Sequence, residues 1–156
     1  MINFLKLNVR AVMRTKMGEK GLHSDDTRSI IKFTENKMTY KGINTNRRRV
    51  LRYQIDGGMF DNNQTKCDNA FGFPDTDDFY LIELKGKDLK HASVQIYDTI
   101  QALNRKIKCY TVHGRIICSK IPRPHLRSTQ IVRLERELAK RGGRLIKKSI
   151  LLEENI

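Results

Sequence analysis

The feature that most constrains the fold is the stretch FYLIELKG at residues 79–86, in which an apolar run stops at Glu83, Leu84 and Lys85. A strand that is apolar on both faces at its start must be covered on both sides, so it belongs in the interior of a layered sheet. The next segment, residues 87–106, has the spacing of an amphipathic helix, with one apolar face formed by Leu89, Ala92, Ile96, Ile100 and Leu103. A helix that follows a central strand predicts a crossover connection and a mixed sheet.

Other elements are predicted around this unit from caps, turns and apolar periodicity. A helix is expected over residues 24–38, capped by Ser24 or Asp25, and a helix over 128–143 is expected to stop at Gly142. Strands are expected over 47–55, 65–73, 107–112 and 115–119, with the last two joined by the dipeptide His113-Gly114 and a closing strand or tail over 144–154.

The predicted fold is therefore α/β, with one mixed central sheet flanked by helices. The 156 residues suit a single domain. We expect a core of about 24–119, a basic N-terminal segment 1–23, and an additional C-terminal helix and strand within 120–156.

The net charge of +14 is unevenly distributed along the chain. Residues 1–52 hold 13 Lys and Arg against 4 acids, and residues 105–148 hold 14 against 2, whereas the segment between them is acidic. Such basic surface favours a polyanionic partner, above all nucleic acid. A generically basic protein is the alternative. No segment pairs a basic face with a long apolar one, so a membrane partner is not expected.

The location expected from the sequence is cytoplasmic. No apolar run approaches the roughly 18 residues of a membrane span, and Lys6 and Arg10 interrupt the N-terminal segment where a secretory signal would need an apolar block. Three cysteines without a C-x-x-C pair favour a reducing compartment over a disulfide framework.

Two charged residues at the end of the central strand form a candidate site. Residues two apart in a strand point to the same face, so Glu83 and Lys85 project together while Leu84 points away into packing. A turn at residues 74–78 joins this strand to the preceding one, and an antiparallel hairpin would bring Asp68 beside Glu83. The alternative is a solvated strand end carrying a same-face ion pair.

The other acids before Glu83 fit this arrangement less well. Asp77 and Asp78 start the same strand, roughly 16 to 20 Å from Glu83 at 3.3 Å per residue. Asp75 lies in the same turn. Asp56 precedes two glycines and is expected to be a turn former bonded to local backbone. The alternative is a different hairpin register, in which Asp56 at the end of the preceding strand supplies the metal ligand.

Adjacent carboxylates raise each other's pKa, and a divalent cation removes that penalty. Oxygen ligands suit Mg²⁺, which also binds phosphate oxygens, and we expect Mn²⁺ to substitute. A lysine beside the ion can position water and neutralise charge that develops on phosphorus. We therefore expect Asp68 and Glu83 to hold the metal and Lys85 to assist hydrolysis of a phosphodiester.

At these residues the chain resembles the PD-(D/E)XK nuclease superfamily, which includes restriction endonucleases and Holliday-junction resolvases. The resemblance is carried by KCDNAFGF (66–73) and FYLIELKG (79–86), followed by the helical pattern. Cys67 stands where the family's name places a proline. The resemblance implies an αβββαβ restriction-endonuclease-like core, a catalytic role for Gln95 on the helix after the motif, and Glu35 on the first helix as a further metal ligand. Gln95 can equally be a polar residue on a half-exposed helix.

Several basic residues are candidates for contact with a nucleic-acid backbone, although each can also belong to a solvated face. They are Arg47, Arg48, Arg49, Lys87, Arg141, Arg144 and Lys147.

Cysteine and histidine residues gather late in the chain. Their spacing matches no common zinc pattern, so buried structural cysteines are the alternative. The four residues are Cys109, His113, Cys118 and His125.

The predicted function is Mg²⁺-dependent cleavage of DNA, double-stranded or branched, and structure-specific cleavage such as Holliday-junction resolution is included. The alternative is a nucleic-acid-binding protein that keeps a nuclease-like fold without the chemistry. A basic protein that acts on another protein is a third class with little support. The sequence leaves open the choice between DNA and RNA, between ends and internal bonds, and between monomer and homodimer.

Overall fold

The computed structural model describes residues 17–121 and 128–156. Two helices and nine strands are defined within these ranges, and their order confirms a mixed α/β domain. In chain order they are β1 (Leu22–Asp26), β2 (Ile30–Glu35), β3 (Met38–Ile43), β4 (Val50–Gln54), β5 (Asn69–Phe73), β6 (Asp78–Lys85), α2 (Leu89–Leu103), β7 (Thr111–Cys118), α3 (Thr129–Lys140), β8 (Leu145–Ser149) and β9 (Leu151–Asn155).

The central sheet has six strands in the order β1-β4-β5-β6-β7-β8. Neighbours from β1 to β6 pair antiparallel, whereas β6, β7 and β8 run parallel. Each parallel pair needs a crossover connection, which α2 supplies between β6 and β7 and α3 supplies between β7 and β8. The apolar run forms β6, which has neighbours on both sides as predicted.

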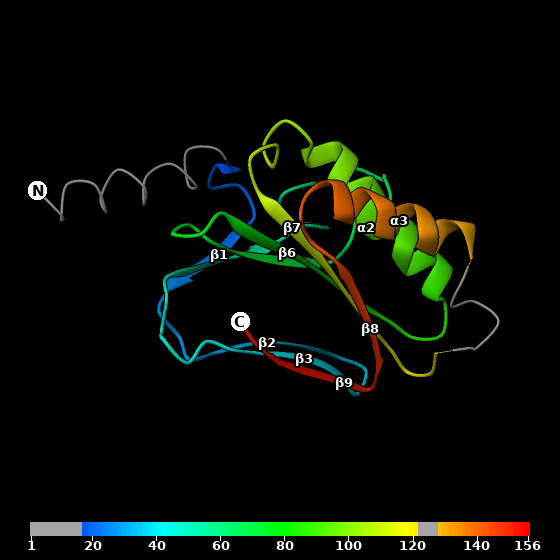
Figure 1. The fold of residues 1–156 in the computed structure, drawn as a ribbon, viewed down its shortest axis with the longest axis horizontal. Coiled ribbons are helices and arrows are strands. Elements are labelled where there is room, and N and C mark those ends of the chain that lie inside the picture. Colours follow the sequence, from blue (N-terminus) through cyan, green and yellow to red (C-terminus); the bar gives the residue numbers. More distant parts are fainter. Residues whose placement is uncertain (1–16, 122–127) are drawn as a thin grey trace, which may run out of the picture.

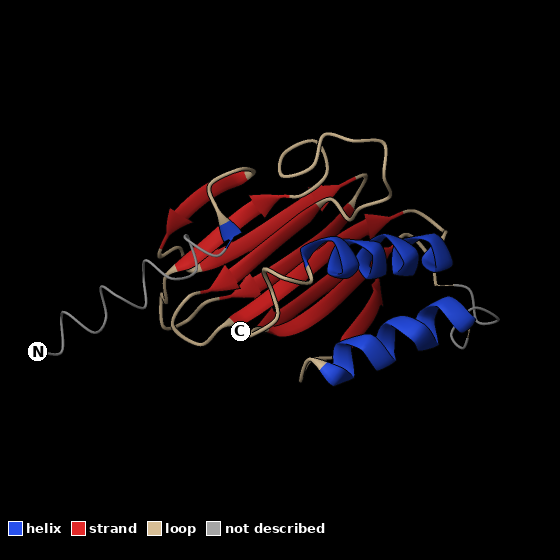
Figure 2. Ribbon diagram, turned by 90° about the horizontal axis from the view of Figure 1, so that it is seen from above, coloured by secondary structure: helices blue, strands red, loops and turns tan. Residues whose placement is uncertain are grey.

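The two faces of this sheet are covered by different structures (Figure 1). α2 and α3 lie side by side over one face, as Figure 2 also shows from above. A second sheet, in the order β2-β3-β9, covers the other face. Side chains of β6 alternate between the two cores: Leu81 packs with the helices, and Tyr80 and Ile82 pack with the small sheet. The ring of Tyr80 stacks on Phe71 with centroids 4.6 Å apart.

In both helices the apolar face predicted from the sequence is the face that is buried. In α2 the five predicted apolar positions are buried, and in α3 so are Ile131, Leu134 and Leu138. Ser128 caps α3 by accepting the Ile131 N–H. Gly142 ends the α3 segment with a φ of +77°, a conformation that favours glycine.

The helix predicted over residues 24–38 is wrong, because this segment forms β1, β2 and the start of β3. β2 and β3 form a hairpin in which Glu35 pairs with Met38. Between them, Asn36 and Lys37 both have positive φ, as a two-residue turn that matches strand twist requires. Residues 24–38 therefore do not supply the first helix of the αβββαβ order that the resemblance implies.

The two strands predicted around His113-Gly114 are one continuous strand, β7. Gly114 is not a turn residue. A Cβ at this position would lie 2.9 Å from Leu138 Cδ1, so the glycine lets α3 pack closely on the strand. The His113 ring stacks on Tyr80 with centroids 4.5 Å apart, on the other face of the sheet.

A sharp corner at Ile150 joins the two sheets. Its N–H donates to the carbonyl of Cys118 in the large sheet, and its own carbonyl accepts from Thr39 N–H in the small one. The predicted closing strand or tail is therefore two strands, β8 in one sheet and β9 in the other.

Candidate active site

The β5–β6 pairing places the two predicted metal-binding acids side by side. Asn69 pairs with Ile82, so the preceding residue, Asp68, lies opposite Glu83. The Asp68 backbone N–H donates to Glu83 Oε2 over 3.1 Å. The hairpin expected from the sequence therefore has the register that was predicted for it.

Hydrogen bonds from α2 hold the chain just before Asp68. Gln95 Nε2 donates to the carbonyl of Lys66 over 3.0 Å, and Thr99 Oγ1 accepts the N–H of Cys67 over 2.9 Å. On the other side, the Asp68 carbonyl accepts from Ile55 N–H over 2.8 Å. Asp68 is thus fixed in place by β4, β6 and α2 together.

β6 directs Glu83 and Lys85 to the helix side of the sheet, while Leu84 packs toward the small sheet as predicted. Glu83 is only 1% exposed, and Lys85 is partly exposed at the strand end. Among the described residues, the hydrogen-bond donor to Glu83 is the Asp68 backbone and not the Lys85 ammonium. A simple surface ion pair between Glu83 and Lys85 does not describe this arrangement.

The pKa of Glu83 lies far above its usual value. Burial raises it to about 8, with a further contribution from the Asp68 carboxylate, and the Lys85 charge offsets only part of this. Burial, followed by the charges of Glu35 and Asp56, likewise raises the pKa of Asp68. The site therefore concentrates negative charge that its one lysine does not neutralise.

Glu35 and Asp56 line the same open pocket of about 360 Å³ as Asp68, Glu83 and Lys85. Glu35 was expected on a helix; it comes instead from the end of β2, at the hairpin turn. Asp56 follows β4 and was expected above all to form the local turn. Its place at a strand end beside two glycines was the available signal for a position near the site.

Gln95 also lines this pocket, from α2, and is 8% exposed. Its amide nitrogen bonds Lys66, whereas its oxygen is buried without a hydrogen-bond partner. The free atom is thus an acceptor. It suits a cation or a donor such as an ammonium or water.

These donors fit the requirements of Mg²⁺. No three His, Cys, Asp or Glu side chains within 17–121 and 128–156 are grouped closely enough to enclose an ion unaided. Mg²⁺ is ordinarily bound by one or two carboxylates and keeps its remaining positions for water and phosphate. Asp68 and Glu83, with the unpartnered Gln95 oxygen in the same pocket, offer an open oxygen-donor site of this type.

Four of the basic candidates contact carboxylates of the protein itself. Arg49 bonds Asp25 through two nitrogens, Arg48 lies over the Phe73 ring and 3.7 Å from Asp75, Arg141 bonds Glu137, and Lys147 bonds Glu135. The other three, Arg47, Lys87 and Arg144, are exposed. Lys87 is the nearest of them to the site in sequence, two residues after Lys85.

Within the described residues, Cys109, His113 and Cys118 do not form a common cluster with metal-binding spacing. β7 is extended from Thr111 to Cys118, so its two ends lie roughly 23 Å apart at 3.3 Å per residue, and Cys109 lies in the turn before its Thr111 end. His113 Nε2 bonds Asp78 over 3.1 Å. His125 and residues 1–16 of the basic N-terminal segment lie outside the described residues.

No protein-family model, curated protein or solved structure matches this chain. Over the described ranges, neither helix has the length and apolarity needed to cross a bilayer.

Proposed function

We propose that this protein is a metal-dependent nuclease that hydrolyses phosphodiester bonds in DNA. The observation that carries the proposal is the pairing of the buried Glu83 with Asp68, in an open pocket that also contains Lys85 and the unpartnered oxygen of Gln95. Burying an acid whose pKa is raised to about 8 costs folding free energy at alkaline pH, which a structural role alone does not explain. Acids with perturbed pKa values in clefts are candidates for functional sites.

Asp68 and Glu83 are the residues that would hold the ion. Asp56 and Glu35 line the same pocket and add negative charge to it. Mg²⁺ or Mn²⁺ bound there supplies positive charge to the phosphate and lowers the pKa of water. Lys85 adds a second positive charge at the open end of the strand, where phosphate oxygens can approach. Gln95 can accept a hydrogen bond from water or from the lysine, which orients the donor.

The substrate is proposed from charge and from the resemblance to PD-(D/E)XK nucleases. The net charge of +14 favours a polyanion, and the Asp, Glu and Lys of the motif share one pocket. Branched DNA, including Holliday junctions, belongs to this proposal. The alternative, a binding protein without chemistry, gives no reason for a buried Glu83 beside Asp68. The three free cysteines agree with a reducing, cytoplasmic location.

Metal dependence is the first test. With plasmid, single-stranded and four-way-junction DNA in a gel assay, we expect cleavage in Mg²⁺ or Mn²⁺ and none in EDTA. An independent measurement is thermal unfolding of the free protein near pH 8. Mg²⁺ should raise the melting temperature, because an ion that binds only the folded state stabilises it by about 2.7 kcal/mol at a hundred times its Kd.

The matched control for this test is Glu83→Gln, whose melting temperature should not respond to Mg²⁺. Undiminished cleavage in EDTA would rule out the mechanism. Tight DNA binding without cleavage in either metal would favour the non-catalytic alternative.

A further inference from the structure

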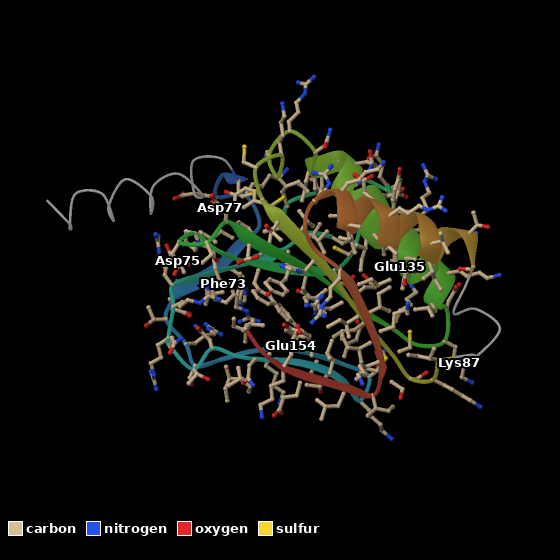
Figure 3. All side chains as sticks on the ribbon, viewed as in Figure 1. Phe73, Asp75, Asp77, Lys87, Glu135 and Glu154 are labelled. Atoms are coloured by element: carbon tan, nitrogen blue, oxygen red, sulfur yellow. The ribbon has the colours of Figure 1, made fainter. Side chains whose placement is uncertain are left out.

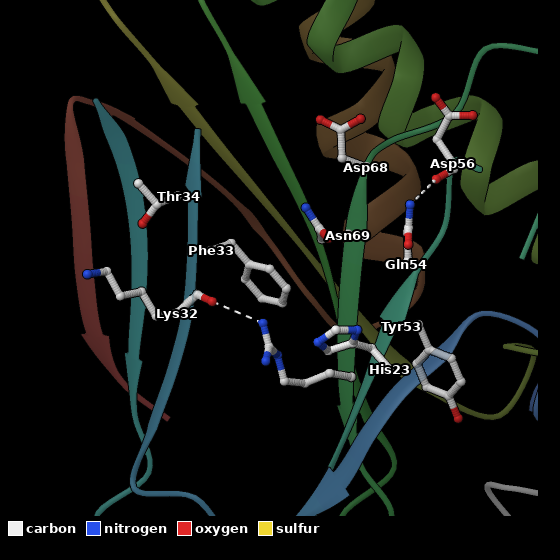
Figure 4. A pocket seen from close by; sticks show the side chains of 10 residues that line it. His23, Lys32, Phe33, Thr34, Tyr53, Gln54, Asp56, Asp68 and Asn69 are labelled. Carbon is white, nitrogen blue, oxygen red and sulfur yellow. Dashed lines mark hydrogen bonds between the residues drawn. The ribbon is translucent and has the colours of Figure 1, made fainter. Parts of the chain in front are cut away.

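The small sheet has an outer face that points away from the central sheet. Side chains alternate along β2, β3 and β9, so every second residue belongs to this outer face. Figure 4 shows the alternation in β2, where the Phe33 ring points toward the central sheet and the Lys32 side chain points away from it. No described element covers the outer face, which lies at the bottom of the view in Figure 1. Its nine residues are Ile30, Lys32, Thr34, Thr39, Lys41, Ile43, Leu151, Glu153 and Asn155.

Exposed apolar side chains gather at this outer face. Within the described residues, the exposed large apolar side chains are Ile30 at 44%, Ile150 at 49% and Leu151 at 50%. Ile30 and Leu151 belong to the outer face, and Ile150 directly precedes β9. Ile43 pairs with Ile30 across β2 and β3 and extends the apolar area. Apolar side chains that gather on one exposed face are typical of an interaction site.

The charged side chains of the outer face form one row across the three strands. Lys32 pairs with Lys41, and Lys41 pairs with Glu153, so the row has Lys32 at the β2 edge and Glu153 at the β9 edge. Lys41 Nζ lies 3.0 Å from Glu153 Oε2. Lys32 is exposed and has no carboxylate partner within the described ranges. A cation without a partner at one edge and a carboxylate at the other make the row complementary to its own reverse.

We propose that the outer face binds the outer face of a second copy of this chain. Sheets that pack face to face lie about 10 Å apart with their strands within about 30° of each other. A two-fold axis along β3 places β2 of each copy over β9 of the other. Lys32 of each copy then lies over Glu153 of the other copy, and Ile43 of one copy lies against Ile43 of the other with Ile30 beside it.

The charges disfavour the other aligned arrangement. A two-fold axis across the strands would place Lys32 over Lys32 and Glu153 over Glu153, and these like charges would repel. The axis along β3 leaves one like pair, between the two copies of Lys41, and each of these is already paired with Glu153 of its own copy. Nine residues a side are fewer than the 20 to 30 of a standard interface, so the dimer should be weak and should form only at high concentration.

This dimer does not depend on the proposed function. Glu35 and Met38 line the acidic pocket from the opposite face of β2 and β3, so the interface leaves that pocket open. The association is therefore measured in EDTA and without DNA, where no cleavage takes place.

Sedimentation velocity of the full chain from micromolar to millimolar concentration tests the proposal. We expect a dimer fraction that rises with concentration. Lys32→Glu and Glu153→Lys should each weaken the dimer about tenfold, because each change replaces two exposed ion pairs of the symmetric interface by like charges. The double variant, Lys32→Glu with Glu153→Lys, restores opposite charges across the interface and should dimerise much as the wild type does.

Lys108→Glu is the matched control, because it makes the same change of charge at an exposed residue of the α2–β7 loop, away from both sheets. It should leave the dimer unchanged. Circular dichroism should show that all variants are folded, since Lys32 and Glu153 are exposed. A wild-type chain that stays monomeric at millimolar concentration would overturn the proposal. A dimer that Lys32→Glu does not weaken would show that another surface is used, and weakening by both single variants without recovery in the double variant would overturn the axis along β3.

Discussion

Glu83→Gln is expected to reduce metal-dependent cleavage by about a thousandfold, the effect of removing one strongly used electrostatic contact from an active site. The amide keeps the shape of the side chain and can still accept the Asp68 N–H, but it cannot supply negative charge to an ion. Asp68→Asn and Lys85→Ala should give losses of similar size. The measurement is the initial rate of plasmid nicking in Mg²⁺, with DNA binding followed separately.

Asp75→Asn and Asp77→Asn are the matched controls for this prediction and should remain active. Figure 3 shows both residues at one end of the molecule and Lys87, just beyond the site, at the other. Asp56→Asn should be impaired, because Asp56 lines the pocket and its charge acts on Asp68. Full activity in both Glu83→Gln and Lys85→Ala would end the nuclease proposal.

In the absence of metal, Glu83→Gln is also expected to stabilise the protein at alkaline pH. Burial raises the pKa of Glu83 from an ordinary value of 4.5 to about 8 in the folded chain. The folded state therefore binds more protons than the unfolded state between these values, and the free energy of unfolding falls as the pH rises through this window. At one pKa unit per 1.4 kcal/mol, the glutamine variant should be more stable by on the order of a few kcal/mol above pH 8.

Chemical denaturation in EDTA at pH 4, 6 and 8.5 measures this effect. Below pH 4.5 the carboxyl is protonated in both states, so the two proteins should differ little there and diverge as the pH rises. Asp61→Asn is a suitable control, since the Asp61 side chain is 82% exposed. A constant difference between Glu83→Gln and the wild type at all pH values would show that Glu83 does not titrate in this range. Mg²⁺ should remove much of the difference at pH 8.5, because the ion replaces the proton.

The core of the candidate site could be predicted because it depends on short-range geometry. Asp68 and Glu83 are 15 residues apart and joined by one tight turn, so alternation along two strands is enough to place them together. Lys85 follows from the same alternation. α2 and α3 were also predictable, because caps and apolar spacing define a helix within its own sequence.

Residues 24–38 show where local pattern was insufficient. Ile30, Ile31 and Phe33 are compatible with a short helix and with an alternating strand. The strand is favoured over the helix because Tyr80, Ile82 and Leu84, on the second face of the central sheet, must be covered by apolar side chains. β2 and β3 provide it together with β9, which comes from the other end of the chain.

The sequence by itself therefore determined the acid–lysine motif, its hairpin and the two helices, because each depends on residues close together in the chain. Only the tertiary structure brought Glu35 and Asp56 to the same pocket and bonded Arg52 of β4 to the backbone carbonyl of Lys32 in β2. These positions depend on packing between two sheets whose strands are distant in sequence. Periodicity within one segment does not predict which sheets pack together, because this packing is stabilised by burying an apolar face that the two sheets share.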